Sequence, residues 1–175
     1  MKKELQLPVA LGFCKNCFRL RRAGSSYCGQ CENETPRMKV YIDSRANFPL
    51  VHDVIKRFDL KASDVDHIVF TYGDTIYTDS EMSVGLIAHE LTHVFQQTML
   101  GKEIWWHKYL TNDKFRMEQE LSAYRQQYAI MAMKNKGDAD MALQSMARDL
   151  SSKIYGNFIS YEKALKTLQK LVLNP

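Results

Sequence analysis

Short apolar runs between residues 40 and 78 predict a small β-sheet. Three of them, 40–42, 68–72 and 75–78, are rich in β-branched and aromatic residues and have the length of strands. Between the first two, apolar residues recur with the helical period, which predicts a helix that opens at Phe48–Pro49. Gly73–Asp74 separates the last two runs and predicts a tight turn. This part of the chain is therefore expected to pack one helix against a small sheet.

Beyond residue 78 the apolar positions follow the helical period almost throughout. The first helix is expected to start at a capping box, Thr78–Glu81, and to end at Gly101. A second helix is expected from about Asp113 to Lys134, and Lys136–Gly137 then breaks the chain. Two more helices are expected around residues 141–154 and 161–172. The predicted fold class is α+β, with a small sheet followed by a helical part.

The first of these helices contains an H-E-x-x-H motif, His89–His93. Residues four apart lie on one face of a helix, so both imidazoles can reach a single metal ion. Glu90 would lie beside that ion, where a carboxylate can accept a proton from a bound water. Gly85, one turn before His89, leaves room on the metal side for another element. A shuffled chain of this composition would contain the motif by chance in roughly one case in a hundred. The alternative interpretation is therefore a chance match, a surface helix with two unrelated histidines.

A hydrolytic zinc site needs three protein ligands and one open position, so a third ligand is expected outside this helix. Glu118 and Glu120, both on the second helix, are candidates. Glu120 shares its face with apolar residues, and a buried carboxylate is costly unless it is paired or binds a metal. Periodicity therefore favours Glu120, and Ala123 permits the two helices to approach closely. His107, beside two tryptophans, is the alternative as a third ligand or a hydrogen-bond donor.

With these residues the chain resembles the gluzincin peptidases, whose second helix carries a ligand glutamate in an E-x-x-A pattern. Glu120–Ala123 fits, although Tyr124 stands where the family often has an aspartate that orients a zinc-bound histidine. The run His89–Gln97 also resembles the H-E-L-T-H-V-x-Q-Q signature of small bacterial and phage zincins, and no third histidine follows in the metzincin spacing. The resemblance covers roughly residues 38–130. It implies that the strand before the metal helix, Asp74–Thr78, is an exposed edge that pairs with an extended peptide substrate.

All four cysteines lie in the first 31 residues and form two C-x-x-C pairs, Cys14 with Cys17 and Cys28 with Cys31. Two such pairs can supply the four thiolates of a tetrahedral structural zinc site. The interval between them is long enough for a short hairpin. The alternative, a pair of disulfides, requires an oxidising compartment. We therefore expect a zinc ribbon at residues 1–36 and a zincin-like metallopeptidase domain at residues 37–175.

Composition sets limits on this interpretation. An apolar fraction of 45% and a charged fraction of 25% are those of an ordinary globular protein. The net charge of +4 does not by itself indicate nucleic-acid binding, although Arg19, Arg21 and Arg22 on the expected hairpin could contact nucleic acid or protein. No apolar run has the length of a membrane span. The first residues lack a signal-peptide cleavage site, so a cytoplasmic protein without membrane contact is expected.

Two functional hypotheses follow from these residues. In the first, the chain is a zinc metallopeptidase that holds two zinc ions, one in the ribbon and one on His89, His93 and Glu120. Glu90 acts as general base on a protein or peptide substrate, and Tyr124 or Tyr128 donates a hydrogen bond to the oxyanion. In the second, the chain is a non-catalytic zinc adaptor that binds nucleic acid or protein through the basic ribbon. The intact Glu90 favours the first, because metal binding alone needs no general base.

Overall fold

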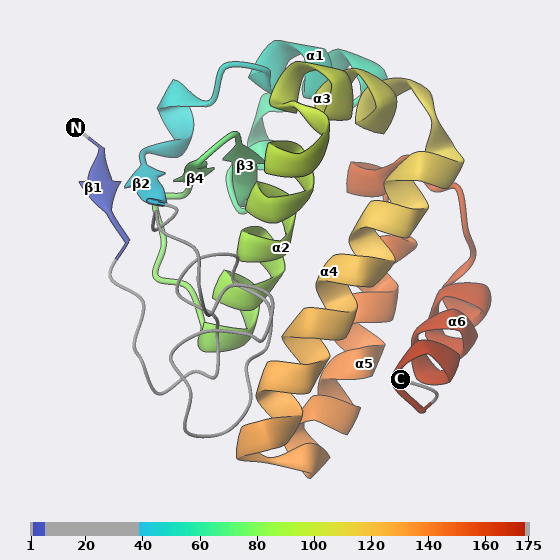
Figure 1. The fold of residues 1–175 in the computed structure, drawn as a ribbon. Helices are drawn as coiled ribbons and strands as arrows, with labels where there is room; N and C mark the ends of the chain where they lie inside the picture. Colours follow the sequence, from blue (N-terminus) through green and yellow to red (C-terminus); the bar gives the residue numbers. More distant parts are fainter. Residues whose placement is uncertain (1, 6–38, 174–175) are drawn as a thin grey trace.

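The structure is a computed structural model that describes residues 2–5 and 39–173. Within them the fold is α+β, as predicted, with a small mixed sheet beside a larger helical part (Figure 1). The sheet has the order β1-β2-β4-β3, and its strands are β1 Lys3–Glu4, β2 Tyr41–Asp43, β3 Phe70–Tyr72 and β4 Thr75–Tyr77. The helices are α1 Val51–Phe58, α2 Val84–Leu100, α3 Lys102–Thr111, α4 Asp113–Lys134, α5 Lys136–Leu150 and α6 Tyr161–Leu173.

The strand that precedes the metal helix lies inside the sheet, and the expectation of an exposed edge at Asp74–Thr78 is wrong. β4 pairs in parallel with β2 and antiparallel with β3. All three of its residues are buried. The edge on this side of the sheet is β3, because β2 comes from a distant part of the sequence and occupies the other side of β4.

The start of α2 also differs from its prediction. Thr78–Glu81 does not cap the helix; Ser83 is the N-cap, and its hydroxyl accepts a hydrogen bond from the Leu86 amide. The Thr78 hydroxyl instead closes a local turn with the backbone of Ser80. Serine and threonine side chains form such turns as readily as helix caps, so the pattern alone did not separate the two. The predicted end of α2 at Gly101 is confirmed, with φ +85° at that glycine.

The helical part matches the apolar periodicity, with three exceptions. The helix expected around residues 141–154 is α5, which ends at Leu150, and Ile154 lies in the separate 3₁₀ turn Lys153–Tyr155. The range of α4 is confirmed, but Lys136–Gly137 lies in the first turn of α5, and the break falls at Asn135, whose side chain caps α5. The segment from Lys102 to Thr111 is a helix, α3, that periodicity did not predict. Its two tryptophans belong to an aromatic core with Phe48, Phe70 and Tyr77. No helix in the described ranges is long and apolar enough to cross a membrane.

The sheet is covered on both faces. On one face Ile76 of β4 packs against Leu91 and Val94 of α2. On the other face Phe70 and Tyr77 pack under α1 and α3. A second apolar core lies between α4, α5 and α6. The side of α2 away from the sheet runs along α4 (Figure 1), so α2 joins the two parts of the molecule.

Gly85 allows α2 and α4 to lie this close. A Cβ at that position would lie 2.9 Å from Cγ of Met131 and 3.3 Å from Cγ of Gln127, both on α4. Ala123, also on α4, is completely buried. The expectation that Gly85 makes room for another element is confirmed.

We expect Gly85→Leu to lower the free energy of unfolding by about 1–3 kcal/mol, because the larger side chain overpacks the contact between α2 and α4. Urea unfolding followed by circular dichroism measures the change. Met131→Ala in the same chain should restore part of the loss, since it removes the side chain that meets position 85. An unchanged stability, or a loss that Met131→Ala does not reduce, would contradict the packing described.

Candidate metal centre

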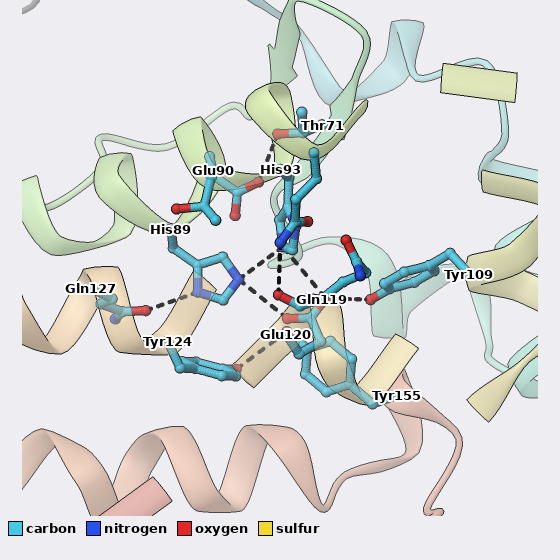
Figure 2. Close-up of polar contacts among 12 residues, drawn as sticks. Thr71, His89, Glu90, His93, Tyr109, Gln119, Glu120, Tyr124, Gln127 and Tyr155 are labelled. Carbon is cyan, nitrogen blue, oxygen red and sulfur yellow. Dashed lines mark hydrogen bonds and ion pairs between the residues drawn. The ribbon is translucent and has the colours of Figure 1, made fainter. Parts of the chain in front are cut away.

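Helices α2 and α4 bring together three side chains that can hold a metal ion: His89, His93 and Glu120. The two Nε2 atoms lie 3.1 Å apart. His89 Nε2 lies 3.3 Å from Oε2 of Glu120, and His93 Nε2 lies 3.4 Å from Oε1. All three residues are buried, and Glu120 is only 1% exposed. Figure 2 shows the two imidazoles from α2 facing the carboxylate from α4.

Two glutamine side chains orient the histidines. His89 Nδ1 lies 3.1 Å from Oε1 of Gln127, and His93 Nδ1 lies 2.9 Å from Oε1 of Gln96. Gln96 donates its own amide N–H to the Gln119 carbonyl, which fixes which end of the amide faces the histidine. Because an amide oxygen only accepts, each Nδ1 carries the proton. In a neutral imidazole the lone pair is then on Nε2, the atom that faces the other two groups.

This arrangement fits a metal ion. Two imidazole lone pairs and a carboxylate converge in a buried space, and only a cation placed between them offsets their repulsion. Oε2 of Glu120 accepts no hydrogen bond from the described residues. Tetrahedral zinc with bonds of about 2.0–2.1 Å holds its ligand atoms about 3.3 Å apart. The three measured separations lie close to that value.

The choice of Glu120 over the alternatives agrees with its position. Glu118 is exposed on the opposite side of α4, and His107 is exposed on α3. Oε1 of Glu120 also accepts a hydrogen bond of 2.7 Å from the Tyr109 hydroxyl. A hydrogen bond of this kind orients a ligand and is typical of the surroundings of protein metal sites.

Glu90 lies beside the cluster without belonging to it. It is buried, and its Oε2 accepts a hydrogen bond of 2.8 Å from the Thr71 hydroxyl of β3. Burial raises the pKa of the Glu90 carboxyl, and the nearby histidines oppose that rise. Figure 2 shows Glu90 and Thr71 on the sheet side of the two imidazoles, whereas Glu120 lies on the α4 side. Glu90 is therefore a second carboxylate at the site. A residue of β3 orients it, whereas a residue of α3 orients Glu120.

Two hollows meet at this cluster. A groove of about 380 Å³ includes His89, Glu90, Tyr124 and Tyr155 in its wall. A smaller cavity of about 60 Å³ reaches all three candidate ligands and also includes Tyr155. The Tyr124 ring lies edge-on to His89, and its hydroxyl is 3.2 Å from that of Tyr155. Tyr128 lines neither hollow; its hydroxyl donates to Asp140 of α5, so the structure does not bring it to the site.

Without a metal ion, a proton on His93 supplies the positive charge at the site. Burial lowers the pKa of His93, but the charge of Glu120 and a hydrogen bond to it outweigh burial and raise that pKa from 6.5 to about 9. Burial raises the pKa of Glu120, but the two histidines outweigh it and hold that pKa well below its usual value. At neutral pH the metal-free site is an ion pair between His93 and Glu120.

Sequence reasoning missed five residues that complete the site: Thr71, Gln96, Tyr109, Gln127 and Tyr155. Two had a usable signal. Gln96 lies one turn after His93, and Gln127 lies two turns after Glu120 on the same face of α4. Gln127 orients His89 through its Nδ1, from a position three residues after Tyr124. The other three come from separate elements and had no local signal.

The remaining predicted site residues lie outside the described residues. They are the four cysteines of the expected ribbon and the basic residues Arg19, Arg21 and Arg22. Within residues 2–5 and 39–173, His89, His93 and Glu120 form the one group of three or more side chains suited to a metal.

Comparison with known proteins places the histidines, but not the glutamate ligand, in a recognised family segment. Residues 54–101 match the family described as the eCIS core domain. The match runs from within α1 to the end of α2 and covers a little over a quarter of the chain. It includes His89, Glu90 and His93, and it ends before Glu120. No curated protein and no solved structure matches the chain significantly.

We expect Glu120→Ala to lower the zinc content of the purified full chain by one ion, because two imidazoles alone leave the site with too few ligands. Glu118→Ala is the matched control, since it removes an exposed carboxylate from the same helix. Elemental analysis gives the zinc content, and circular dichroism checks the fold. Loss of zinc from Glu118→Ala, or none from Glu120→Ala, would show that the ligand assignment is wrong.

The ion pair gives the metal-stripped protein a defined dependence on pH. A pKa raised from 6.5 to about 9 on folding adds stability that is complete below pH 6.5 and is lost as the pH rises through 9. Wild type and Glu120→Gln, both metal-free, should therefore differ most in free energy of unfolding at pH 5 to 6.5. The difference should shrink as the pH rises to 9. A difference that stays constant over that range would exclude the pair.

Proposed function

We propose that this chain is a zinc-dependent metallopeptidase with His89, His93 and Glu120 as metal ligands and Glu90 as general base. The observation that carries the proposal is the position of Glu90, a buried carboxylate beside the three ligands but outside them. A site that only stores or binds metal needs no such group. Burial raises the pKa of Glu90 despite the two histidines beside it, so the buried carboxylate is costly, and catalysis is a reason to keep one.

The three ligand residues come from two helices, the histidines from α2 and the glutamate from α4. His89 and His93 are held by Gln127 and Gln96, and Glu120 is held by Tyr109. A zinc ion bound there supplies Lewis-acid activation of a water molecule and of the scissile carbonyl. The groove beside His89 and Glu90 provides the approach for a peptide.

Glu90 would accept the proton of the attacking water and pass it to the leaving amine. Its burial raises the pKa of the carboxyl, which brings it closer to the working pH of a general base. The Thr71 hydroxyl fixes the orientation of the carboxylate by donating to Oε2. β3 therefore sets the position of the base, while α2 sets its distance from the ligands.

The anionic oxygen that develops on the carbonyl needs a hydrogen-bond donor. Tyr124 and Tyr155 both line the groove. Burial raises the pKa of each hydroxyl well above 10, so both remain donors at neutral pH. Tyr155 also lines the cavity that reaches the three ligands, and we assign it as the donor, with the Tyr124 hydroxyl donating to Tyr155 at 3.2 Å. Tyr128 is left out because its hydroxyl is bound to Asp140.

The first 36 residues complete the proposal. A ribbon on Cys14, Cys17, Cys28 and Cys31 would hold a second, structural zinc ion. Its basic residues would recruit a protein substrate, or a nucleic-acid partner, to the peptidase in the cytoplasm. The adaptor hypothesis keeps the ribbon and dispenses with hydrolysis, so the test has to separate binding from cleavage.

We expect Glu90→Gln to keep the zinc content and the fold and to lower cleavage by about 10²–10⁴-fold, because an amide cannot accept the proton. The variant should retain captured proteins that the wild type cuts and releases. Mass spectrometry of captured proteins, with a search for new chain termini, measures both effects. Glu118→Gln is the control for loss of one glutamate charge.

The adaptor hypothesis gives the opposite result. Wild type and Glu90→Gln would then hold the same partners in equal amounts, and no new termini would be found. That outcome would lead us to abandon the peptidase assignment.

A further inference from the structure

The second glutamine of the run His89–Gln97 forms its hydrogen bonds with β3 and not with a candidate metal ligand. Gln97 lies on α2 two turns after Glu90, so the two side chains leave the same face of the helix. It is only 1% exposed. Its Nε2 donates to the Thr71 carbonyl at 2.8 Å, and its Oε1 accepts from the Gly73 N–H at 2.8 Å. Gln97 therefore binds the strand from which Thr71 contacts Glu90.

The Gln97 amide takes the place that a neighbouring strand would fill. β3 is the edge of the sheet on this side, and no strand in the described part of the chain lies beyond it. A residue of a parallel neighbour donates to one carbonyl and accepts from the N–H two residues later, as Gln97 does with Thr71 and Gly73. A side chain of α2 thus fixes the outer side of β3 as a further strand would.

Thr71 is the residue at which these contacts meet. It is buried, and its carbonyl accepts a second hydrogen bond, of 3.1 Å, from Nε1 of Trp106 on α3. Both lone pairs of that oxygen are then used. The Thr71 hydroxyl donates to Oε2 of Glu90 at 2.8 Å. Gln97 and Trp106 therefore hold the backbone of the residue whose hydroxyl orients Glu90.

Glu90 and Gln97 together connect α2 to Thr71 at two points. Glu90 binds the hydroxyl and Gln97 binds the carbonyl. Rotation of β3 about its own axis would break at least one of these hydrogen bonds, and movement of β3 away from α2 would break both. Either change would leave buried polar groups unpaired, which is costly. The direction in which the Thr71 hydroxyl points is therefore restricted.

We propose that Gln97 is a positioning residue for Glu90 and acts through Thr71, with support from Trp106. The Gln97 amide fixes the backbone of Thr71, and that backbone fixes the hydroxyl that orients the carboxylate. The inference rests on the proposed function only in naming Glu90 as the general base. In the alternative, Gln97 does no more than satisfy two main-chain groups at the edge of the sheet. The two differ in whether the hydrogen bond between Thr71 and Glu90 depends on the Gln97 amide.

The first test measures that hydrogen bond in the zinc-loaded full chain, at one fixed zinc concentration. Thr71→Val removes the donor and Glu90→Leu removes the acceptor. Urea unfolding of the two single variants and the double variant gives the coupling between the positions. The same cycle is then measured with Gln97→Met, which keeps the length of the side chain and removes the amide. We expect the coupling to fall by at least half, because the Thr71 hydroxyl is no longer held in place.

Two further variants make the result specific. Tyr128→Phe is the control, because it removes a hydrogen bond to Asp140 away from β3; it should lower stability and leave the coupling unchanged. Trp106→Phe removes the second donor to the Thr71 carbonyl and should lower the coupling. An unchanged coupling in Gln97→Met, with the fold confirmed by circular dichroism, would overturn the proposal. If Gln97→Met does not fold, an unchanged coupling in Trp106→Phe would overturn it.

The second test uses cleavage of a protein that Glu90→Gln retains. Gln97→Met should keep the zinc content, lower kcat about tenfold and change KM by less than about threefold, because a displaced base slows the chemical step and leaves binding as it was. In the Glu90→Gln chain, Gln97→Met should cause no further loss, since it acts through Glu90. A loss of the same size in both chains would show that Gln97 supports only the fold.

The two tests separate this inference from the proposed function. If the coupling falls in Gln97→Met but the wild type cuts no protein, Gln97 positions Glu90 and the peptidase assignment fails. If Glu90→Gln traps substrates but the coupling is unchanged in Gln97→Met, the peptidase assignment stands and the role of Gln97 is wrong.

Discussion

The structure depends on the meeting of three electron-pair donors in a buried space. Two imidazole nitrogens and a carboxylate lie within 3.4 Å of one another. Such a group is stable only with a cation among its members, either a proton on His93 or a metal ion. The cation is thus part of what holds α2 against α4. The same burial that makes the site costly when empty makes a bound metal a strong electrostatic centre.

Residues of both α2 and α4 allow the two helices to lie close together and link them by hydrogen bonds. Gly85 and Ala123 remove the side chains that would hold them apart. The hydrogen bond from Gln96 to the Gln119 carbonyl ties the histidine-bearing helix directly to α4. Gln127 of α4 also links the two helices, because its Oε1 accepts a hydrogen bond from Nδ1 of His89. Orientation of the ligands and packing of the helices are therefore produced by the same contacts.

Arg116 connects the site to the rest of the helical part. Its side chain is completely buried one turn before Glu120. It donates to the carbonyl of Tyr109 at 2.6 Å and to the carbonyl of Tyr155 at 3.0 Å, and it pairs with Asp113. These contacts fix the backbone of the two tyrosines whose side chains reach the site. A buried arginine needs all its donors satisfied, which explains why α3, α4 and the turn before α6 meet at this point.

The sequence by itself determined what local geometry decides. Residues four apart must share a helix face, so His89 and His93 could be paired in advance, and the apolar neighbours of Glu120 placed it inward and Glu118 outward. The range of α4 followed from the same periodicity, and the end of α2 followed from Gly101. Only the tertiary structure decided which strand is the edge, because β4 became internal by pairing with the distant β2. It likewise decided the roles of Thr71, Gln97, Tyr109 and Tyr155, since each side chain acts on a group from another element, and no periodicity within one segment records which elements will meet.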